Sequence, residues 1–144
     1  MQKGVIYICV LAVLLVAAVI RPVSAIADDS KVLWQACHPY ERRTTCVVDG
    51  DTLWYQGTKI RLLDIDAPEV EGHCKNECQL AQAATAELTR LLNTGLVQIA
   101  YDGQDQYCRH LARIWVREGE IGTAMLTGGL AEPFGQRGPS PWCR

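Results

Sequence analysis

The segment from Val47 to Glu69, VVDGDTLWYQGTKIRLLDIDAPE, limits the possible folds of this chain more than any other feature. Short runs of β-branched and aromatic residues alternate in it with turn signals such as Asp49-Gly50, which predicts a series of short strands. Five carboxylates and one arginine, Arg61, interrupt these apolar runs. Charged groups are costly to bury unless they are paired or bound to a metal ion, so the segment predicts a β-rich fold that gathers charges at one site.

The order of the expected elements indicates an α+β fold that is mainly β. Strands are expected over 44–48, 52–55 and 59–65, then a helix, then strands over 97–101 and 111–116, and a short helix over 121–127. The first helix is expected to be capped by Asn76, with Gln79 as its capping-box partner, and to stop at Gly95. Five short strands with an inserted helix favour a small closed barrel over a parallel sheet.

The first 25 residues have the pattern of an export signal. Lys3 precedes an apolar stretch over 5–20, and Val23-Ser24-Ala25 is similar to a signal-peptidase site. We expect cleavage after Ala25, with retention as an N-terminal membrane anchor as the alternative. Residues 26–144 then suffice for one compact domain. They keep 12 of the 14 Lys and Arg and all 16 Asp and Glu, a formal charge of −4. This balance argues against tight non-specific binding of nucleic acid, although it allows a local basic cleft.

Six cysteines in residues 26–144 form the even set that is typical of a disulfide framework in a small exported chain. They are Cys37, Cys46, Cys74, Cys78, Cys108 and Cys143. The alternative is a zinc site formed by Cys74, Cys78 and either His73 or His38, but the paired C-x-x-C spacing of structural zinc is missing. The tail over 132–144 is rich in Gly and Pro and is expected to be irregular and tethered through its cysteine.

Two aspartates of the charged segment suit a metal site. Asp51 and Asp66 can supply carboxylate oxygens and Ala67 a backbone carbonyl, and such hard oxygen ligands suit Ca²⁺. The alternative is that Asp51 belongs to a turn and Asp66 merely precedes a proline turn.

Glu69 lies just beyond Pro68, beside the metal candidates, where a general base can activate or orient a water molecule; the alternative is a solvated loop acid. Arg61 favours a functional site because it occupies a strand position where an apolar residue is expected. Strict alternation places Arg61 and Asp66 on opposite faces, so they converge only if the chain bends or bulges over 64–66. A second arginine, Arg109, stands at the start of the strand expected over 111–116.

Three segments resemble the signature segments of the staphylococcal nuclease (thermonuclease) family. They are VVDGDT over 47–52, IRLLDIDAPE over 60–69 and DQYCRHLA over 105–112. Their order and intervals are also similar, and the likeness covers roughly residues 44–131. The resemblance implies a five-stranded Greek-key OB-fold barrel with one helix inserted after the third strand and a short one after the fifth.

The same resemblance implies a role for each candidate residue. Asp51 and Asp66 match the calcium carboxylates, and Ala67 stands where a backbone carbonyl is the ligand. Glu69 matches the general base of the family, and Arg61 and Arg109 match its phosphate-binding arginines. Tyr107, in the same segment as Arg109, is assigned to substrate binding.

The implied activity is calcium-dependent hydrolysis of phosphodiester bonds in DNA and RNA, leaving 3′-phosphate ends. The expected substrate is single-stranded or unpaired nucleic acid, and the expected enzyme is a monomer without a stable protein partner, secreted or periplasmic. The alternatives are a non-catalytic OB-fold binding module and an exported structural domain that binds calcium for stability only.

Several positions depart from the family pattern. Gln106 replaces a lysine, and Cys108 replaces a glycine before the second arginine. The family's late tyrosines have no clear match, although Phe134 is a candidate for stacking on a base. We expect the pairs Cys37–Cys46, Cys74–Cys143 and Cys78–Cys108, since Cys78 and Cys108 both depart from the family pattern. The alternative pairs Cys74 with Cys78 and Cys108 with Cys143.

Overall fold

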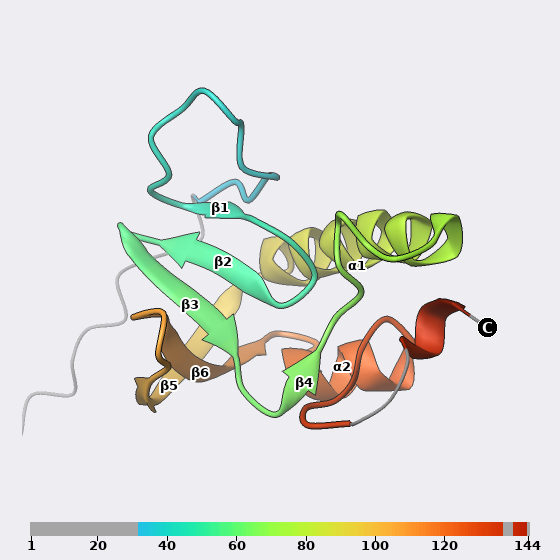
Figure 1. The fold of residues 1–144 in the computed structure, drawn as a ribbon. Coiled ribbons are helices and arrows are strands. Elements are labelled where there is room, and N and C mark those ends of the chain that lie inside the picture. The colour runs from blue at the N-terminus through green and yellow to red at the C-terminus, as the bar shows by residue number, and fades with distance from the viewer. Residues whose placement is uncertain (1–31, 137–139, 144) are drawn as a thin grey trace, which may run out of the picture.

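The computed structural model describes residues 32–136 and 140–143 (Figure 1). The expected export signal over 1–25 lies outside the described residues. Within the described part of the chain, no helix has the length and apolar character needed to cross a membrane.

The main sheet is mixed and contains six strands. Its order is β1 (Cys46–Val47), β2 (Thr52–Tyr55), β3 (Thr58–Leu62), β6 (His110–Val116) and β5 (Leu96–Gln104), with β7 (Gly119–Glu120) paired to β6. Strands β3 and β6 are parallel, and the other neighbours are antiparallel. A second, two-stranded sheet joins β4 (Ile65–Asp66) to β8 (Glu132–Pro133). The helices are α1 (Lys75–Asn93) and α2 (Ile121–Thr127), followed near the C-terminus by the 3₁₀ turn η2 (Pro141–Cys143).

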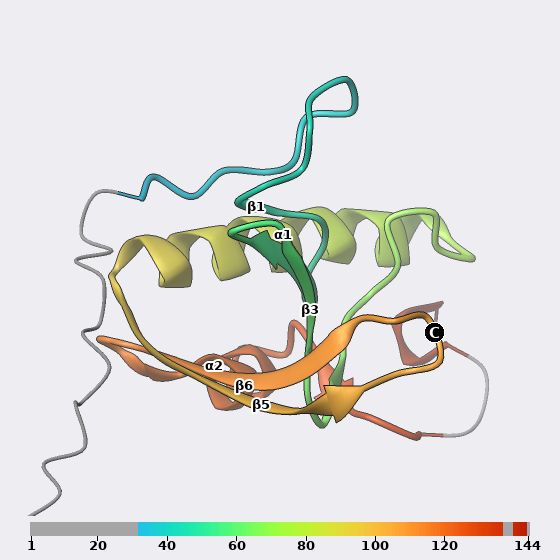
Figure 2. The same ribbon diagram turned by 90° about the vertical axis from the view of Figure 1, so that its left-hand side faces the viewer.

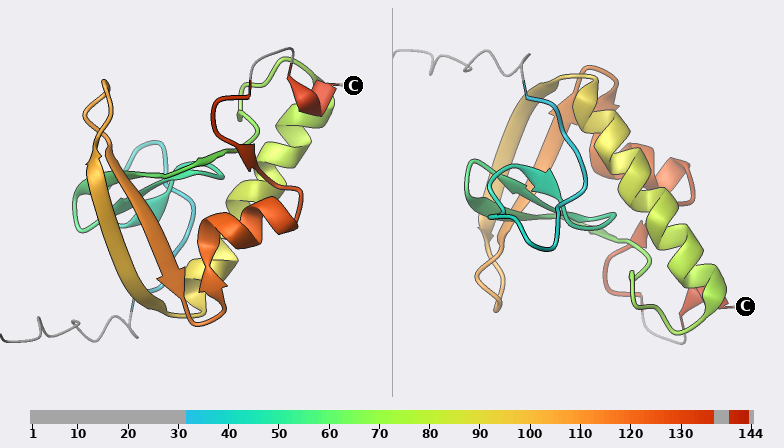
Figure 3. Two further views of the ribbon diagram at one scale, coloured as in Figure 1. Left: turned by 90° about the horizontal axis from the view of Figure 1, so that it is seen from below. Right: turned by 90° about the horizontal axis from the view of Figure 1, so that it is seen from above.

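The α+β class is confirmed, and the order of strands and helices is consistent with an OB-like fold. The strand expected over 59–65 is divided into β3 and β4 by a turn. No closed barrel is present among the described residues, because β1 and β5 are not paired with each other. Helix α1 contacts β1 and α2 instead, and Figure 3 shows both helices on the same side of the β5–β6 ribbon. The buried face of α1 therefore completes the core that strand pairing leaves open.

Helix α1 carries its apolar residues at helical spacing toward the core, where Ala81, Ala84, Leu88, Leu91 and Leu92 are buried. The expected cap is wrong: Cys74 is the N-cap residue, and the Asn76 side chain donates to the carbonyl oxygen of Trp142 at 2.7 Å. The stop at Gly95 is as predicted, since this glycine adopts a φ of 117° just after the helix.

Gly50 allows the turn before β2 to pack closely on the helix. A Cβ atom at this position would lie 2.6 Å from the Ala84 side chain and 2.8 Å from that of Ala67. Any larger residue would push Asp51, the next residue, away from the chain around Ala67. The turn, the helix and the chain after β4 therefore meet at one point.

Two of the three expected disulfides are present, Cys37–Cys46 and Cys74–Cys143. The third is wrong, because Cys78 and Cys108 are free thiols. Cys78 lies in the first turn of α1 and Cys108 in the turn between β5 and β6, and Figure 3 shows these two places far apart. Disulfide formation requires Cα atoms within about 7 Å, so the fold prevents this pairing.

The two disulfides hold the ends of the described chain. Cys37–Cys46 closes a loop, the stapled loop (residues 37–46), which projects away from the sheet in Figure 2. Cys74–Cys143 ties η2 to the start of α1. The tail is therefore tethered as expected, but it also contributes β8 and the 3₁₀ turn.

Candidate active site

A sharp bend after β3 brings Arg61 and Asp66 together. Leu62 ends the strand, and Asp64 adopts a φ of 65°, in the left-handed region that few residues other than glycine visit easily. An Arg113–Asp64 ion pair and the Phe134 N–H, which donates to the Asp64 carbonyl oxygen at 2.9 Å, hold this turn. As a result Arg61 Nη2 lies 2.7 Å from Asp66 Oδ1, although alternation alone would place the two side chains on opposite faces.

Asp51 joins the same cluster from the neighbouring strand. Thr52 is the register partner of Arg61, so the two strands carry Asp51 and Arg61 to the same place. Arg61 Nη1 lies 2.9 Å from Asp51 Oδ2, as an ion pair without hydrogen-bond alignment. The Thr52 hydroxyl donates to Asp51 Oδ1 at 2.8 Å, and the Ala67 N–H donates to Oδ2 at 3.0 Å. These contacts orient the aspartate and hold the backbone of Ala67 against it.

The cluster carries excess negative charge. Burial, reinforced by the neighbouring Asp49, raises the pKa of Asp51 to about 6, although Arg61 opposes the shift. Burial also raises the pKa of Glu69, and the charges of Asp51 and Asp66 raise it further. Glu69 is therefore coupled to both aspartates and holds its proton more readily than an isolated glutamate.

These residues fit a calcium ion. Asp51 and Asp66 provide hard carboxylate oxygens, and the excess negative charge is what a divalent cation offsets. In the described chain, Asp51, Asp66 and Glu69 do not bring three ligand atoms within 4.8 Å of one another. The carboxylates of Asp51 and Asp66, with the backbone of Ala67 held beside them, are the groups that would hold such a cation.

A cysteine-containing metal site is not supported. Among the described residues, Cys74, Glu77 and Cys143 are the one group of potential ligand atoms that gathers within this distance. The two cysteines are bonded to each other, so they offer no thiolates.

The second arginine is presented by a turn that Asp105 organises. Asp105 Oδ1 accepts from the backbone N–H groups of Tyr107 and Arg109, at 2.9 and 3.0 Å, and its Oδ2 lies 2.7 Å from Arg109 Nε. Cys108 occupies the turn with a φ of 59°, where the family pattern has a glycine. The two terminal nitrogens of the Arg109 guanidinium have no bond to this aspartate.

Arg61 and Arg109 line one pocket of about 420 Å³. The parallel pairing of β3 with β6 makes them neighbours, since Arg61 is the register partner of Leu111. Aromatic rings stand beside both guanidinium groups: the Cζ of Arg61 lies 5.4 Å from the centre of the Phe134 ring, and that of Arg109 lies 5.5 Å from the Tyr107 ring. Two cations with two aromatic walls suit a ligand that combines phosphate and a flat base.

Glu77 is a residue of the site region that the sequence reasoning missed. It is 4% exposed, its Oε2 accepts from the His73 N–H at 2.7 Å, and the same oxygen lies 3.4 Å from Cys143 Sγ. Its side chain also fills the space under Gly72. Glu77 therefore holds the loop that runs from Glu69 to α1. The sequence does contain a signal for it: position 77 stands at helical spacing from positions 81, 84 and 88, which form the buried face of α1.

Comparisons with known proteins identify the family. The family model described as "Staphylococcal nuclease homologue" matches residues 59–140. A protein from Haemophilus influenzae named "Uncharacterized endonuclease" is 31% identical over 104 residues, which cover 69% of this chain and 55% of the relative. The chain thus spans about half the length of that relative. On the evidence of the family match, which takes in most of β3, the bend, both arginines and α1, the chain belongs to the family of staphylococcal nuclease homologues.

Proposed function

We propose that this chain is an exported, calcium-dependent nuclease of the thermonuclease type, which hydrolyses phosphodiester bonds of DNA and RNA and leaves 3′-phosphate ends. Membership of a nuclease family implies a nucleic-acid substrate. The observation that carries the proposal is the convergence of Arg61, Asp51 and Asp66 beside the pocket that also contains Arg109.

Asp51, Asp66 and the backbone of Ala67 would hold the calcium ion. When bound, the ion supplies charge that polarises a non-bridging phosphate oxygen. Until then, Arg61 partly balances the two carboxylates, each of which retains further acceptor capacity.

Glu69 is the general base of the proposal. It accepts a proton from the attacking water, and a pKa above its ordinary value brings a carboxylate closer to the neutral range in which bases work best. Arg109 keeps its terminal nitrogens for two phosphate oxygens, and this fork geometry stabilises the negative charge that grows in the transition state.

The aromatic walls favour a single-stranded or unpaired substrate, because only an unpaired base can turn its face to Phe134 or Tyr107. The two disulfides support export to an oxidising compartment, secreted or periplasmic, with anchoring by residues 5–20 as the alternative. A monomer without a stable protein partner completes the proposal.

The test is cleavage of denatured DNA by the purified protein, with calcium or with a chelator. We expect calcium-dependent cleavage that Glu69→Gln reduces by about 10²-fold or more, and no comparable loss in Glu71→Gln, a matched change at an exposed neighbouring acid. Arg61→Ala and Arg109→Ala are each expected to reduce the rate on the order of 10²–10³-fold. A loss below about tenfold in either variant would contradict the role assigned to that arginine. Intact folding and DNA binding without cleavage would favour the non-catalytic module instead.

A further inference from the structure

The stapled loop presents positive charge in a fixed position. Arg42 and Arg43 are exposed at its centre, and Tyr40 is 92% exposed. The disulfide closes the loop, and the Cys37 N–H donates to the Val47 carbonyl oxygen at 2.7 Å where the loop joins β1. Because the loop is already constrained, binding through it would require little further ordering.

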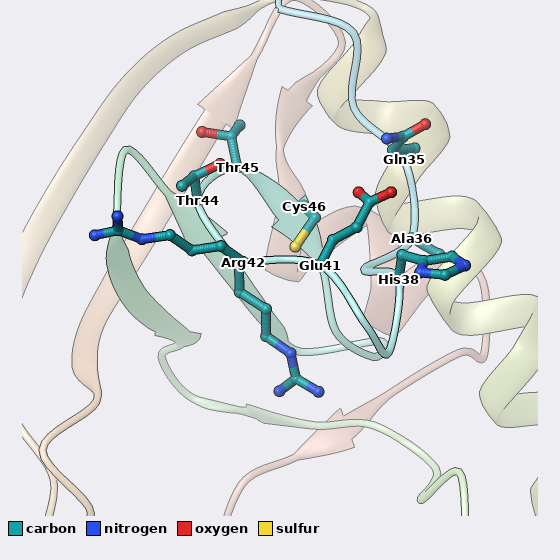
Figure 4. Close-up of a pocket in the computed structure, with 9 residues that line it drawn as sticks. Gln35, Ala36, His38, Glu41, Arg42, Thr44, Thr45 and Cys46 are labelled. Atoms are coloured by element: carbon teal, nitrogen blue, oxygen red, sulfur yellow. The ribbon is translucent and has the colours of Figure 1, made fainter.

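The two arginines of this loop form no ion pair within the described residues. Arg90, Arg109 and Arg113 each form an ion pair with a carboxylate, whereas none of the ion pairs in the described residues includes Arg42 or Arg43. Figure 4 shows Arg42 and Glu41 leaving the loop in different directions, with the Glu41 carboxylate turned toward Gln35.

The end of the loop lies beside the turn that leads into β3, the strand that carries Arg61. The Gly57 N–H donates to the Thr44 carbonyl oxygen at 2.8 Å, which fixes the end of the loop beside the turn between β2 and β3. Lys59 follows this turn and lies on the same face of β3 as Arg61, because alternate residues of a strand point to the same side. The Cα atoms of these two residues are about 7 Å apart along the strand. Ile60, between them, points into the core. Lys59, like the two loop arginines, has no ion pair within the described residues.

We propose that Arg42, Arg43 and Lys59 form a basic track that binds the backbone of a single-stranded nucleic acid beyond the catalytic pocket, with Tyr40 as a stacking surface for a base. Cations along a surface combined with an aromatic side chain are the usual means of holding single strands without sequence preference. The track gives an acidic chain a local attraction for a polyanion. It rests on the proposed function, and the stapled loop lies outside the residues 59–140 that match the family.

The ligand of the loop is a strand on its surface rather than a small molecule inside it. The pocket between the loop and Gln35–Ala36 measures about 110 Å³ (Figure 4), whereas small-molecule sites usually measure about 300 Å³ or more.

The experiment measures binding of two labelled ligands, a dinucleotide and a single strand of about 12 nucleotides, by fluorescence anisotropy with a chelator present to prevent cleavage. The variant Arg42→Ser/Arg43→Ser is compared with Lys75→Ser/Arg117→Ser, which removes the same charge from exposed positions at the start of α1 and after β6. For the long strand, the loop variant is expected to lose about tenfold in affinity, and its slope of log K against log salt becomes shallower by about 1.4, for two lost phosphate contacts. Dinucleotide binding stays within about twofold of wild type, because that ligand fills only the catalytic pocket.

Three results would overturn the track: no measurable binding of the long strand by the wild type, equal losses in the two double variants, or an unchanged salt slope in the loop variant. Lys59→Ser extends the test and is expected to make the slope shallower by about a further 0.7. Because binding is read without turnover, absence of nuclease activity would disprove the proposed function while leaving this measurement valid.

Discussion

Asp51→Asn is expected to stabilise the metal-free protein and to abolish calcium-dependent cleavage. Asp51 is 7% exposed, and burial together with Asp49 raises its pKa from 3.8 to about 6. One pKa unit corresponds to about 1.4 kcal/mol, so the ionised carboxylate costs the folded, metal-free protein about 3 kcal/mol. Asparagine has the shape of the neutral acid and can still accept from the Ala67 N–H, while Arg61 keeps its partner Asp66 at 2.7 Å.

The sign of the pH dependence follows from the direction of the shift. A carboxyl group whose pKa is raised in the folded state stabilises the fold most when it is protonated. The contribution of Asp51 to the free energy of unfolding is therefore greatest below pH 3.8 and is lost as the pH rises through about 6. The variant has no such titration. Its advantage in the free energy of unfolding should therefore grow from near zero at about pH 4 to about 3 kcal/mol at about pH 8.

The assay is urea unfolding followed by tryptophan fluorescence, for wild type and variant, across this pH range with a chelator and again with calcium. The difference between the two proteins is the measured quantity, because carboxylates such as Glu87 and Glu118, whose pKa values Arg90 lowers, add pH dependence of the opposite sign to both. Calcium should stabilise the wild type by mass action and leave Asp51→Asn unchanged. A variant less stable than wild type at about pH 8 with chelator, or a difference independent of pH, would refute the reasoning.

Three further predictions concern the framework of the site. Replacing Cys74 and Cys143 by serine should lower the free energy of unfolding by about 4 kcal/mol, because this disulfide spans 69 residues. The same change at Cys37 and Cys46, whose disulfide spans 9, should lower it by about 2.6 kcal/mol. Denaturant unfolding measures both losses, and equal losses would contradict this account. Cys108→Gly should be more stable than Cys108→Val by about 1–2 kcal/mol, because a φ of 59° disfavours a branched side chain; thermal unfolding giving the reverse order would exclude strain here. Glu77→Ala should lower kcat by about a hundredfold, because it releases the His73 backbone and the loop that carries Glu69. Glu77→Gln keeps an acceptor for the His73 N–H and should recover most of the rate. If it does not, the negative charge of Glu77, and not its hydrogen bond, supports activity.

Much of the architecture could be predicted from local patterns. The bounds of α2 agree with the prediction, and α1 follows the expected face and ends before Gly95, because helical spacing and glycine stops act within a few residues. The pairs Cys37–Cys46 and Cys74–Cys143 are also as expected. The prediction that Asn76 caps α1 was wrong, because its side chain donates to the carbonyl oxygen of Trp142, a tertiary contact.

The candidate residues could be proposed from the sequence, whereas their arrangement could not. The carboxylates, the two arginines and their spacing can be seen in the amino-acid sequence, and they already indicate the family. The positive φ of Asp64, through which Arg61 meets both Asp51 and Asp66, is visible in the folded chain alone. The same holds for the free thiols of Cys78 and Cys108. The buried carboxylate of Glu77, which accepts from the His73 N–H, likewise became visible in the folded chain alone. Turn and helix signals are local, whereas these contacts depend on how α1, β3 and the parallel strand β6 pack together, and packing joins residues that local patterns cannot relate.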